Sequence, residues 1–512
     1  MRAEDWFTFI AMLVCASVLK WAVWRATRLP ERIYRSRSML WALITSRRMP
    51  IIVLGVSAVP IALVWNQTVW SGFETPAPRV IVCSVVGFIA WTDSAYAPNY
   101  YFGRLHLLDR SVVVLLALGV VVHPVFLPAF VLASVTISRQ FTHPDAMGQS
   151  WSDRRILYDF VTMGTAYIFV RGFTPASESV LLTGLIAVVA AAYFYSGLAK
   201  VRLSPYPCAW VFHNRSHRLV FSSRCYGWLW WLSDDALVRV AATLRPLNVP
   251  LQLVTLVLEL GVVFLLADER VMVGLLAGLI AMHVGIFAVS GICFWKWITL
   301  DILLATTLLL WPHDMYGVSG VAAMALAVVS ARIWSEPPLL GWYDTNFVKL
   351  FRLESVEADG SVREIGRTSM VPYDLPFGQS RFFYLSDQPV LVGTYGALTR
   401  VDVDQFSLTR HIEQSEGRAD RIEELKRDFG VNPSRPDVAA RFERFIREYF
   451  IARRSMPRPW LFSTPVHLFS RVRGDKADPA NVQHVRVRAI EYFHDDKGIR
   501  VVSDQIVLDI VI

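Results

Sequence analysis

The chain has 512 residues, 51 Lys and Arg against 43 Asp and Glu, and a hydrophobic fraction of 54%. This apolar content exceeds what a soluble enzyme needs and favours a membrane protein. The positive charge is uneven, because residues 1–334 carry 26 basic and 17 acidic side chains, whereas residues 335–512 carry 25 and 26. The basic excess therefore belongs to loops between membrane segments and gives no argument for nucleic-acid binding.

Residues 1–334 alternate apolar runs with polar loops. The runs are 7–24, 51–70, 80–92, 112–137, 156–170, 179–199, 250–267, 271–290, 297–311 and 317–334. We expect a polytopic α-helical membrane protein with about 8–10 spans, multi-pass in the cell membrane and in contact with the lipid bilayer. The segment 25–48 carries seven arginines against one glutamate, which is typical of a cytoplasmic loop.

The run at 112–137 is interrupted by His123, Pro124 and Pro128. A proline inside a helix removes a backbone hydrogen bond and kinks or ends the helix. This run therefore predicts either one kinked helix or two partial helices.

After 335–338 the composition becomes that of a soluble protein, so we divide the chain into a transmembrane domain, 1–334, and a C-terminal soluble α+β domain, 335–512. Strands are expected at 347–356, 361–368, 464–473, 482–493 and 501–512, the first two joined by a turn at 358–360. Helix is expected in at least part of 405–429 and again after Ser434. The apolar face of this second helix indicates a helix of the domain core, with a membrane-surface helix as the alternative.

The stretch from Val180 to Lys200 is the one around which the chain is organised. Residues 180–199 carry no formal charge and would form about 30 Å of helix, enough to cross a bilayer. Lys200 follows directly. One interpretation is that Lys200 extends its ammonium group to the lipid headgroups. The other is that burial away from water lowers its pKa enough for it to act as a base. Only 7 of the 51 basic residues are lysines, and only lysine can release its proton.

Three further ionisable groups, Glu259, His283 and Asp301, lie within apolar runs. Such groups are expensive in a membrane and generally mark a polar cavity or a proton path. The alternative for Glu259 is a structural pair with His283 or Arg332. Asp301 lies near an expected helix start, where an acidic side chain also suits the helix dipole.

Residues 201–249 interleave arginines with tryptophans, which suits helices lying in the membrane interface. His213 and His217 are four residues apart and would share a helix face, as some metal ligands do. No third ligand is near, so no metal is predicted. Of the five cysteines, only Cys208 and Cys225 are candidates for a disulfide, and only on an oxidising face of the membrane.

Residues 193–200 read YFYSGLAK. This segment resembles the YFxAGxxK stretch of vitamin K-dependent γ-glutamyl carboxylases and of the wider horizontally transferred transmembrane (HTTM) domain family that contains them. Glu259, the segment 268–270, His283 and the segment 291–294 resemble the Glu/Asp, Arg, His and Gly-x-Phe pattern of the same domain. The resemblance is strongest over 180–305, and weaker similarity extends back to about 50.

The resemblance implies a membrane enzyme in which Lys200 is the base, with His283 and Glu259 as further catalytic residues. In the carboxylases, a lysine at this position deprotonates vitamin K hydroquinone. Oxygen converts the anion into a strong base that removes a γ-proton from a substrate glutamate, and carbon dioxide adds to the carbanion. The implied cofactor is reduced vitamin K or another lipid quinone, and the implied partner is a secreted or membrane-associated peptide.

Two departures from the family support a second hypothesis. The carboxylases follow their lysine with an acidic residue, a Trp and a Gly-Tyr pair, whereas residues 201–207 here read VRLSPYP. They also carry an Asn-His pair before an earlier helix, whereas Asn99 is followed by a histidine only at His106. The second hypothesis is a non-catalytic membrane maturation or export factor for a secreted peptide. A transporter is the third, without the paired broken helices typical of that class.

Overall fold

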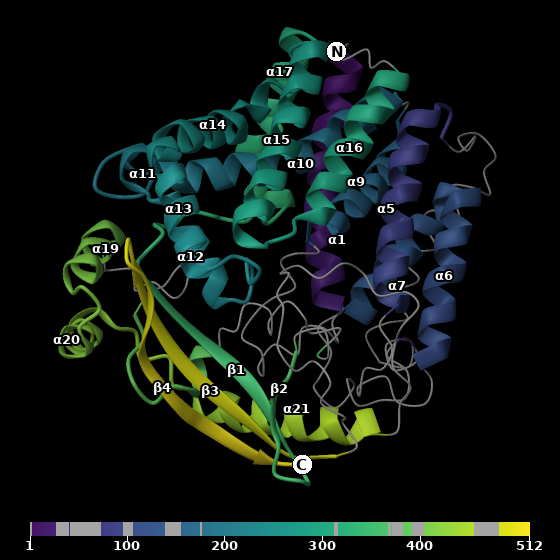
Figure 1. The fold of residues 1–512 in the computed structure, drawn as a ribbon. Helices are drawn as coiled ribbons and strands as arrows, with labels where there is room; N and C mark the ends of the chain where they lie inside the picture. Colours follow the sequence, from purple (N-terminus) through teal and green to yellow (C-terminus); the bar gives the residue numbers. More distant parts are fainter. Residues whose placement is uncertain are drawn as a thin grey trace.

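The protein is described from a computed structural model. The structure describes residues 3–26, 40, 73–95, 106–138, 155–174, 177–311, 316–366, 370, 382–391, 404–454 and 481–512. Within these ranges the first two-thirds of the chain is helical, and the last third combines helices with an antiparallel sheet (Figure 1). The apolar run 51–70, the predicted strand 464–473, Asn99 and most of the arginine-rich segment 25–48 lie outside the described residues.

The helical part contains long helices that run along one another (Figure 1). Their bounds are α1 Ala3–Ala26, α5 Pro76–Ala95, α6 His106–Val122, α7 Leu127–Ser138, α9 Arg155–Arg171, α10 Glu178–Val201, α14 Asn248–Gly261, α15 Glu269–Ser290, α16 Trp295–Leu310 and α17 Val318–Trp334. Shorter helices connect α10 to α14: α11 Ala209–His213, η5 Ser216–Arg218, α12 Leu219–Cys225, α13 Asp234–Leu244 and η6 Arg245–Leu247.

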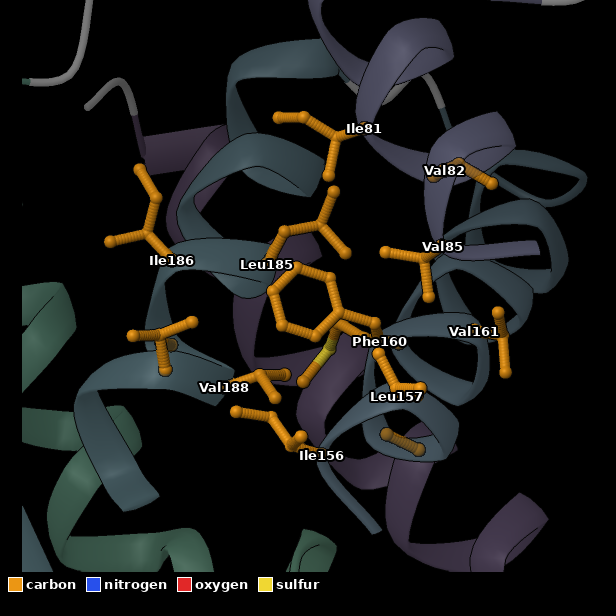
Figure 2. Packing of buried hydrophobic residues seen from close by; sticks show 14 of the residues in the cluster. Ile81, Val82, Val85, Ile156, Leu157, Phe160, Val161, Leu185, Ile186 and Val188 are labelled. Atoms are coloured by element: carbon orange, nitrogen blue, oxygen red, sulfur yellow. The ribbon is translucent and has the colours of Figure 1, made fainter. Parts of the chain in front are cut away.

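Helix α10 is the central helix of this part, in contact with α1, α9, α14 and α17. Its side chains are buried along almost the whole helix. Figure 2 shows Leu185 and Val188 of α10 facing Phe160 of α9 and Val85 of α5. An apolar helix covered on all sides belongs to the interior of a bundle, so α10 is not a lipid-facing span.

Four segments of the described chain are long and apolar enough to cross a membrane: Ala3–Val23, Glu178–Val201, Asp234–Phe264 and Glu269–Ser290. Apolar side chains such as Leu253, Val254 and Val257 on α14 are exposed, as expected for a surface that faces lipid. Membrane association is therefore supported by length and composition, and the larger number of about 8–10 spans stays a prediction.

The run 112–137 forms two helices, which decides between the two alternatives that its prolines left open. Helix α6 ends at Val122, and a short 3₁₀ turn, η2 (Pro124–Phe126), leads into α7. The ring Nδ1 of His123 accepts a hydrogen bond from the backbone N–H of Val125 and caps this turn. Pro128 lies in the first turn of α7, where its missing N–H has no helical partner to lose.

The C-terminal sheet has the strand order β2-β1-β3-β4, with all neighbours antiparallel. The strands are β1 Phe347–Glu357, β2 Val362–Glu364, β3 Val482–Asp495 and β4 Gly498–Val511. The predicted hairpin is confirmed, and Gly360 in its turn adopts φ +79°. Strand β2 is shorter than the predicted 361–368, because regular pairing with β1 ends at Glu364.

The helices of this domain are α19 Gln405–Gln414, α20 Ala419–Phe429 and α21 Pro436–Arg454. The predicted helical segment 405–429 is two helices, separated by a turn in which Gly417 adopts φ +66°. On α21, Phe442, Ile446 and Tyr449 are buried against the sheet. The interpretation of this helix as part of the domain core is confirmed.

The sheet is covered on both faces. Phe351 and Leu353 of β1 face α21, whereas Val348 and Leu350 point the other way, as alternation along a strand requires. This second face packs on Cys225 at the end of α12. The C-terminal domain therefore rests on the connecting helices between α10 and α14, and Figure 1 shows the sheet beside them.

Candidate functional site

Lys200 and Glu259 form a buried ion pair between α10 and α14. The Lys200 ammonium donates to both carboxylate oxygens of Glu259 at 2.7 Å, and it also lies over the Trp210 ring at 5.5 Å from the centroid. The two side chains are only 11% and 7% exposed. Lys200 is thus held inside the protein rather than extended to a headgroup region.

The sequence suggested His283 or Arg332 as the partner of Glu259, and the structure shows neither. Glu259 bonds Lys200, whereas Arg332 lies on the exposed side of α17 over the Tyr195 ring. Glu259 and Lys200 are 59 positions apart, so no local pattern connects them.

Gly197 allows this ion pair to form. A Cβ atom at position 197 would lie 3.0 Å from the Glu259 Cβ and 3.0 Å from a methyl carbon of Leu260. These distances are shorter than ordinary van der Waals contact, so a side chain at position 197 would push Glu259 and Leu260 of α14 away from α10. The glycine of the YFYSGLAK segment is therefore a packing requirement for the Lys200–Glu259 pair.

We expect Gly197→Leu to destabilise the protein by about 1–3 kcal/mol, the usual range for overpacking, and to separate Lys200 from Glu259. Thermal unfolding in detergent measures the loss of stability. Gly285→Leu on α15 is the matched control, because Gly285 is exposed and a Cβ at that position meets nothing within 4 Å. Equal stability of Gly197→Leu and Gly285→Leu would contradict this packing argument.

A second group of polar side chains joins α10, α15 and α16. The Tyr193 hydroxyl donates to Asp301 Oδ2 at 2.6 Å and lies 3.2 Å from His283 Nδ1. Asp301 is fully buried and its other oxygen, Oδ1, has no hydrogen-bond partner among the described residues. Since the Tyr193 proton is directed at Asp301, His283 Nδ1 carries the hydrogen of the second bond, and its Nε2 keeps a free lone pair.

Asp301 lies in the seventh position of α16, which begins at Trp295. The dipole effect falls off within the first turn, so a helix-start role does not explain this carboxylate. Its partner is Tyr193, one of the residues of the YFYSGLAK segment.

One cavity of about 170 Å³ brings all three predicted site residues together. Lys200, Glu259 and His283 line it from three different helices, and Tyr193 lines it as well. Most of its remaining wall is aromatic or aliphatic: Trp210, Leu219, Met282, Ile286, Ile292, Phe294, Trp297, Leu340 and Trp342. The arrangement is an apolar chamber with proton-accepting groups from several helices, which we call the inner cavity.

The segment between α17 and β1 closes one side of the inner cavity. A Cβ at Gly341 would lie 2.9 Å from the backbone carbonyl carbon of Ala199, so this segment crosses α10 one residue before Lys200. The Trp210 indole donates to the Trp342 carbonyl oxygen at 2.9 Å. The chain thus places backbone from the start of the C-terminal domain directly over the lysine.

Asn214 and Asp344 form a polar part of this wall that sequence reasoning missed. The Asn214 side chain donates to Asp344 Oδ2 at 3.0 Å, and its Oδ1 accepts from the Asp344 backbone N–H at 2.8 Å. Burial raises the pKa of Asp344 to about 6. The two residues are 130 positions apart, and neither lies in a recognisable motif, so no sequence signal indicated this contact.

His213 and His217 do not share a helix face, contrary to the spacing argument. Helix α11 ends at His213, and the chain turns at Asn214 before η5 begins at Ser216. His213 contacts Tyr206 and Phe406, whereas His217 bonds Asn248.

The described residues contain no group of three or more His, Cys, Asp and Glu side chains that could hold a metal ion. Cys208 and Cys225 are both free in the structure, and burial raises the pKa of the Cys225 thiol to about 12. The disulfide considered between them is not formed.

The chain matches no protein-family model, no characterised protein and no solved structure. The resemblance to the HTTM domain and to the carboxylases stays a prediction carried by its motifs.

Proposed function

We propose that the chain is a polytopic membrane enzyme of the vitamin K-dependent carboxylase type, which uses a lipid quinol and modifies a peptide. The observation that carries the proposal is the inner cavity, where the three residues indicated by the motifs line one apolar chamber. The motifs lie on three helices, so their convergence is not a consequence of sequence proximity. A proton-abstracting base needs such a water-poor pocket to avoid being quenched.

The inner cavity fits the aromatic ring of a quinol in size and chemistry. An apolar cavity of about 150 Å³ accepts benzene, and the inner cavity measures about 170 Å³. Trp297 and Phe294 offer ring faces for stacking, while Lys200 offers a polar contact for a hydroxyl group. A reduced quinone supplies acidic hydroxyl groups and the electrons that reduce oxygen.

The role of Lys200 depends on its partner. An ammonium group cannot accept a proton, so Lys200 must first pass one to the Glu259 carboxylate, 2.7 Å away. The neutral amine can then take a proton from a hydroxyl group placed beside it. We assign Glu259 the role of holding the lysine proton, and exclusion of water from the chamber keeps the neutral pair accessible.

His283 is the second proton acceptor of the cavity. Its Nδ1–H donates to the Tyr193 hydroxyl, which itself donates to the Asp301 carboxylate. These hydrogen bonds orient the ring and leave Nε2 as the available base. We assign Tyr193 and Asp301 as positioning residues for His283. Tyr193 contacts the ring directly, and through this hydrogen bond, backed by the Asp301 carboxylate, it stabilises the imidazolium form after proton transfer.

The experiment is co-expression of the full chain with candidate secreted peptides, followed by mass spectrometry of the peptides. The expected result is a peptide whose glutamate residues gain the mass of carbon dioxide when vitamin K hydroquinone is supplied. A peptide whose export depends on the chain but whose mass is unchanged would favour a non-catalytic maturation or export factor instead.

A further inference from the structure

A second, larger cavity of about 570 Å³ lies beside the inner cavity. Both parts of the protein line it. The helical part contributes η5, η6 and α12, and the C-terminal domain contributes α19, the α19–α20 turn and the β3–β4 hairpin. We call it the outer cleft. Its lining is mostly charged, in contrast to the apolar inner cavity.

The two cavities share a wall. Asn214 and Ser216 line the inner cavity, whereas Arg215, His217 and Arg218 line the outer cleft. The same division occurs on the other segment of the wall, where Asp344 faces the inner cavity and Asn346 the outer cleft. The Arg218 guanidinium ties the two segments together by donating to the Asp344 carbonyl oxygen at 3.3 Å.

The charges of the outer cleft do not balance. Six cations line it (Arg215, Arg218, Arg245, Arg418, Lys497 and Arg500), together with four carboxylates (Glu413, Glu416, Asp495 and Asp496). Three pairs form, namely Arg218–Glu413 at 2.8 Å, Arg245–Asp496 at 3.0 Å and Arg500–Asp495 at 3.1 Å.

Removing these three pairs leaves the cations Arg215, Arg418 and Lys497 against the single carboxylate of Glu416. Three minus one gives a surplus of two positive charges among the described residues. This surplus matches a phosphate monoester, which carries about −1.5 to −2 at neutral pH, better than it matches a single carboxylate. Arginine is also the side chain best suited to bind phosphate oxygens in a bidentate manner.

His217 adds an uncharged donor. Asn248 Oδ1 accepts from the His217 backbone N–H at 3.1 Å, so its amide nitrogen donates to the ring Nδ1 at 2.8 Å. The ring hydrogen is therefore on Nε2, which has no hydrogen-bond partner among the described residues. Burial lowers the pKa of His217 to about 4, so the ring is neutral at physiological pH and still donates from Nε2.

Two buried atoms of the lining also lack a partner. His494 is fully buried and bonds Ser222 through Nε2, but its Nδ1 has no hydrogen-bond partner in the described structure. The side-chain oxygen of Asn346 has none either, although this residue is only 6% exposed. Buried polar atoms without partners are rare in native proteins and indicate that water or a ligand completes them.

We infer that the outer cleft is a binding site for a phosphate group. The surplus of two positive charges and the His217 Nε2–H define a ligand with strong acceptors, and a phosphate dianion supplies these. The buried side-chain oxygen of Asn346 needs a donor, which is either a water molecule or the hydroxyl of a hydrogen phosphate. The phosphate belongs either to a lipid headgroup or to a free ion or small metabolite, since the same atoms recognise each.

The test uses the full chain in detergent and in lipid nanodiscs, with thermal unfolding as the readout, because a ligand that binds only the folded state raises the unfolding temperature. Inorganic phosphate is the first probe, with sodium chloride at equal ionic strength as reference. Phosphatidic acid against phosphatidylcholine in the nanodisc is the second. Stabilisation by inorganic phosphate indicates a free phosphate ligand, and stabilisation by phosphatidic acid alone indicates a headgroup.

The double variant Arg418→Gln, Lys497→Gln is expected to weaken binding of the active probe by about tenfold or more, as loss of two charge-assisted contacts implies. Both side chains are exposed, so their replacement leaves the fold intact. Arg421→Gln on α20, an exposed arginine paired with Glu424 outside the cleft, is the matched control and should bind as the parent does.

The inference is overturned if neither probe raises the unfolding temperature of the parent protein. It is also overturned if a probe stabilises the double variant as much as the parent. It is also overturned if a glutamate-rich peptide stabilises the protein and neither phosphate probe does, because the cleft would then bind an acidic peptide.

Discussion

Glu259→Leu is expected to destabilise the protein by about 3–5 kcal/mol, the usual result of removing one partner of a buried ion pair. The loss arises because the Lys200 ammonium would remain only 11% exposed with no carboxylate beside it. Lys200→Met should have a similar effect, since it leaves the Glu259 carboxylate buried and unpaired. Thermal unfolding of the three proteins in detergent measures these differences.

The double variant Lys200→Met, Glu259→Leu is the informative control. Apolar groups of similar volume often replace a buried ion pair with little loss of stability. We therefore expect the double variant to be more stable than either single variant, which is a strong coupling in the double-mutant cycle. Additive losses in the double variant would mean that the two charges do not interact as the 2.7 Å distance indicates.

Glu491→Gln is expected to have the largest effect in the C-terminal domain. Glu491 on β3 binds Lys349 at 3.1 Å through one oxygen and Lys426 at 2.7 Å through the other, and all three side chains are at most 5% exposed. Burial lowers the pKa of Lys349 even though Glu491 opposes this change, so the ammonium form is disfavoured by its surroundings. Removing the carboxylate leaves Lys349 buried without an ion-pair partner beside Lys426, which keeps only the exposed Glu423 at 2.6 Å. We therefore expect a loss of about 3–5 kcal/mol.

Lys349→Met should cost less than Glu491→Gln, because Glu491 keeps Lys426 as a partner and the variant leaves no buried charge unpaired. The measurement is thermal unfolding of the full chain, with tryptic digestion to locate the loss in the C-terminal domain. Arg421→Met, which removes an exposed pair with Glu424 on α20, is the control and should change stability by less than about 1 kcal/mol. Equal losses for Lys349→Met and Glu491→Gln would contradict the assigned network.

The local features of the fold could be predicted from the sequence. The β1–β2 hairpin was predictable because its turn residues, with Gly360, lie next to one another in the chain. The two long strands and α21 followed from short-range alternation and an apolar helix face. The separation of α6 from α7 was left open, because a proline can either kink a helix or end it.

The interior position of α10 could not be predicted. A run of apolar residues looks the same whether the helix faces lipid or other helices, and only the packing of α1, α9, α14 and α17 around it decides. For the same reason, Lys200 after this run allowed both a snorkelling and a buried interpretation.

The three residues proposed from the sequence line one cavity, but the contacts that each of them makes could not be predicted. Lys200, Glu259 and His283 were indicated because charge within apolar sequence is costly. Their contacts depend on tertiary packing: Glu259 pairs with Lys200, while His283 bonds Tyr193, a residue of the YFYSGLAK segment to which the sequence assigned no role. Asn214 and Asp344 form the wall of the cavity from segments 130 positions apart.

The comparison of Lys200→Arg with Lys200→Ala in the peptide-modification assay tests the central claim most directly. Arginine keeps the charge and can keep the bond to Glu259, but it cannot release its proton. If Lys200 is a base, Lys200→Arg should be as inactive as Lys200→Ala, while the Arg variant accumulates in the membrane as the parent does. Full activity of Lys200→Arg would show that the position needs only a positive charge, and it would contradict the role of Lys200 as a base.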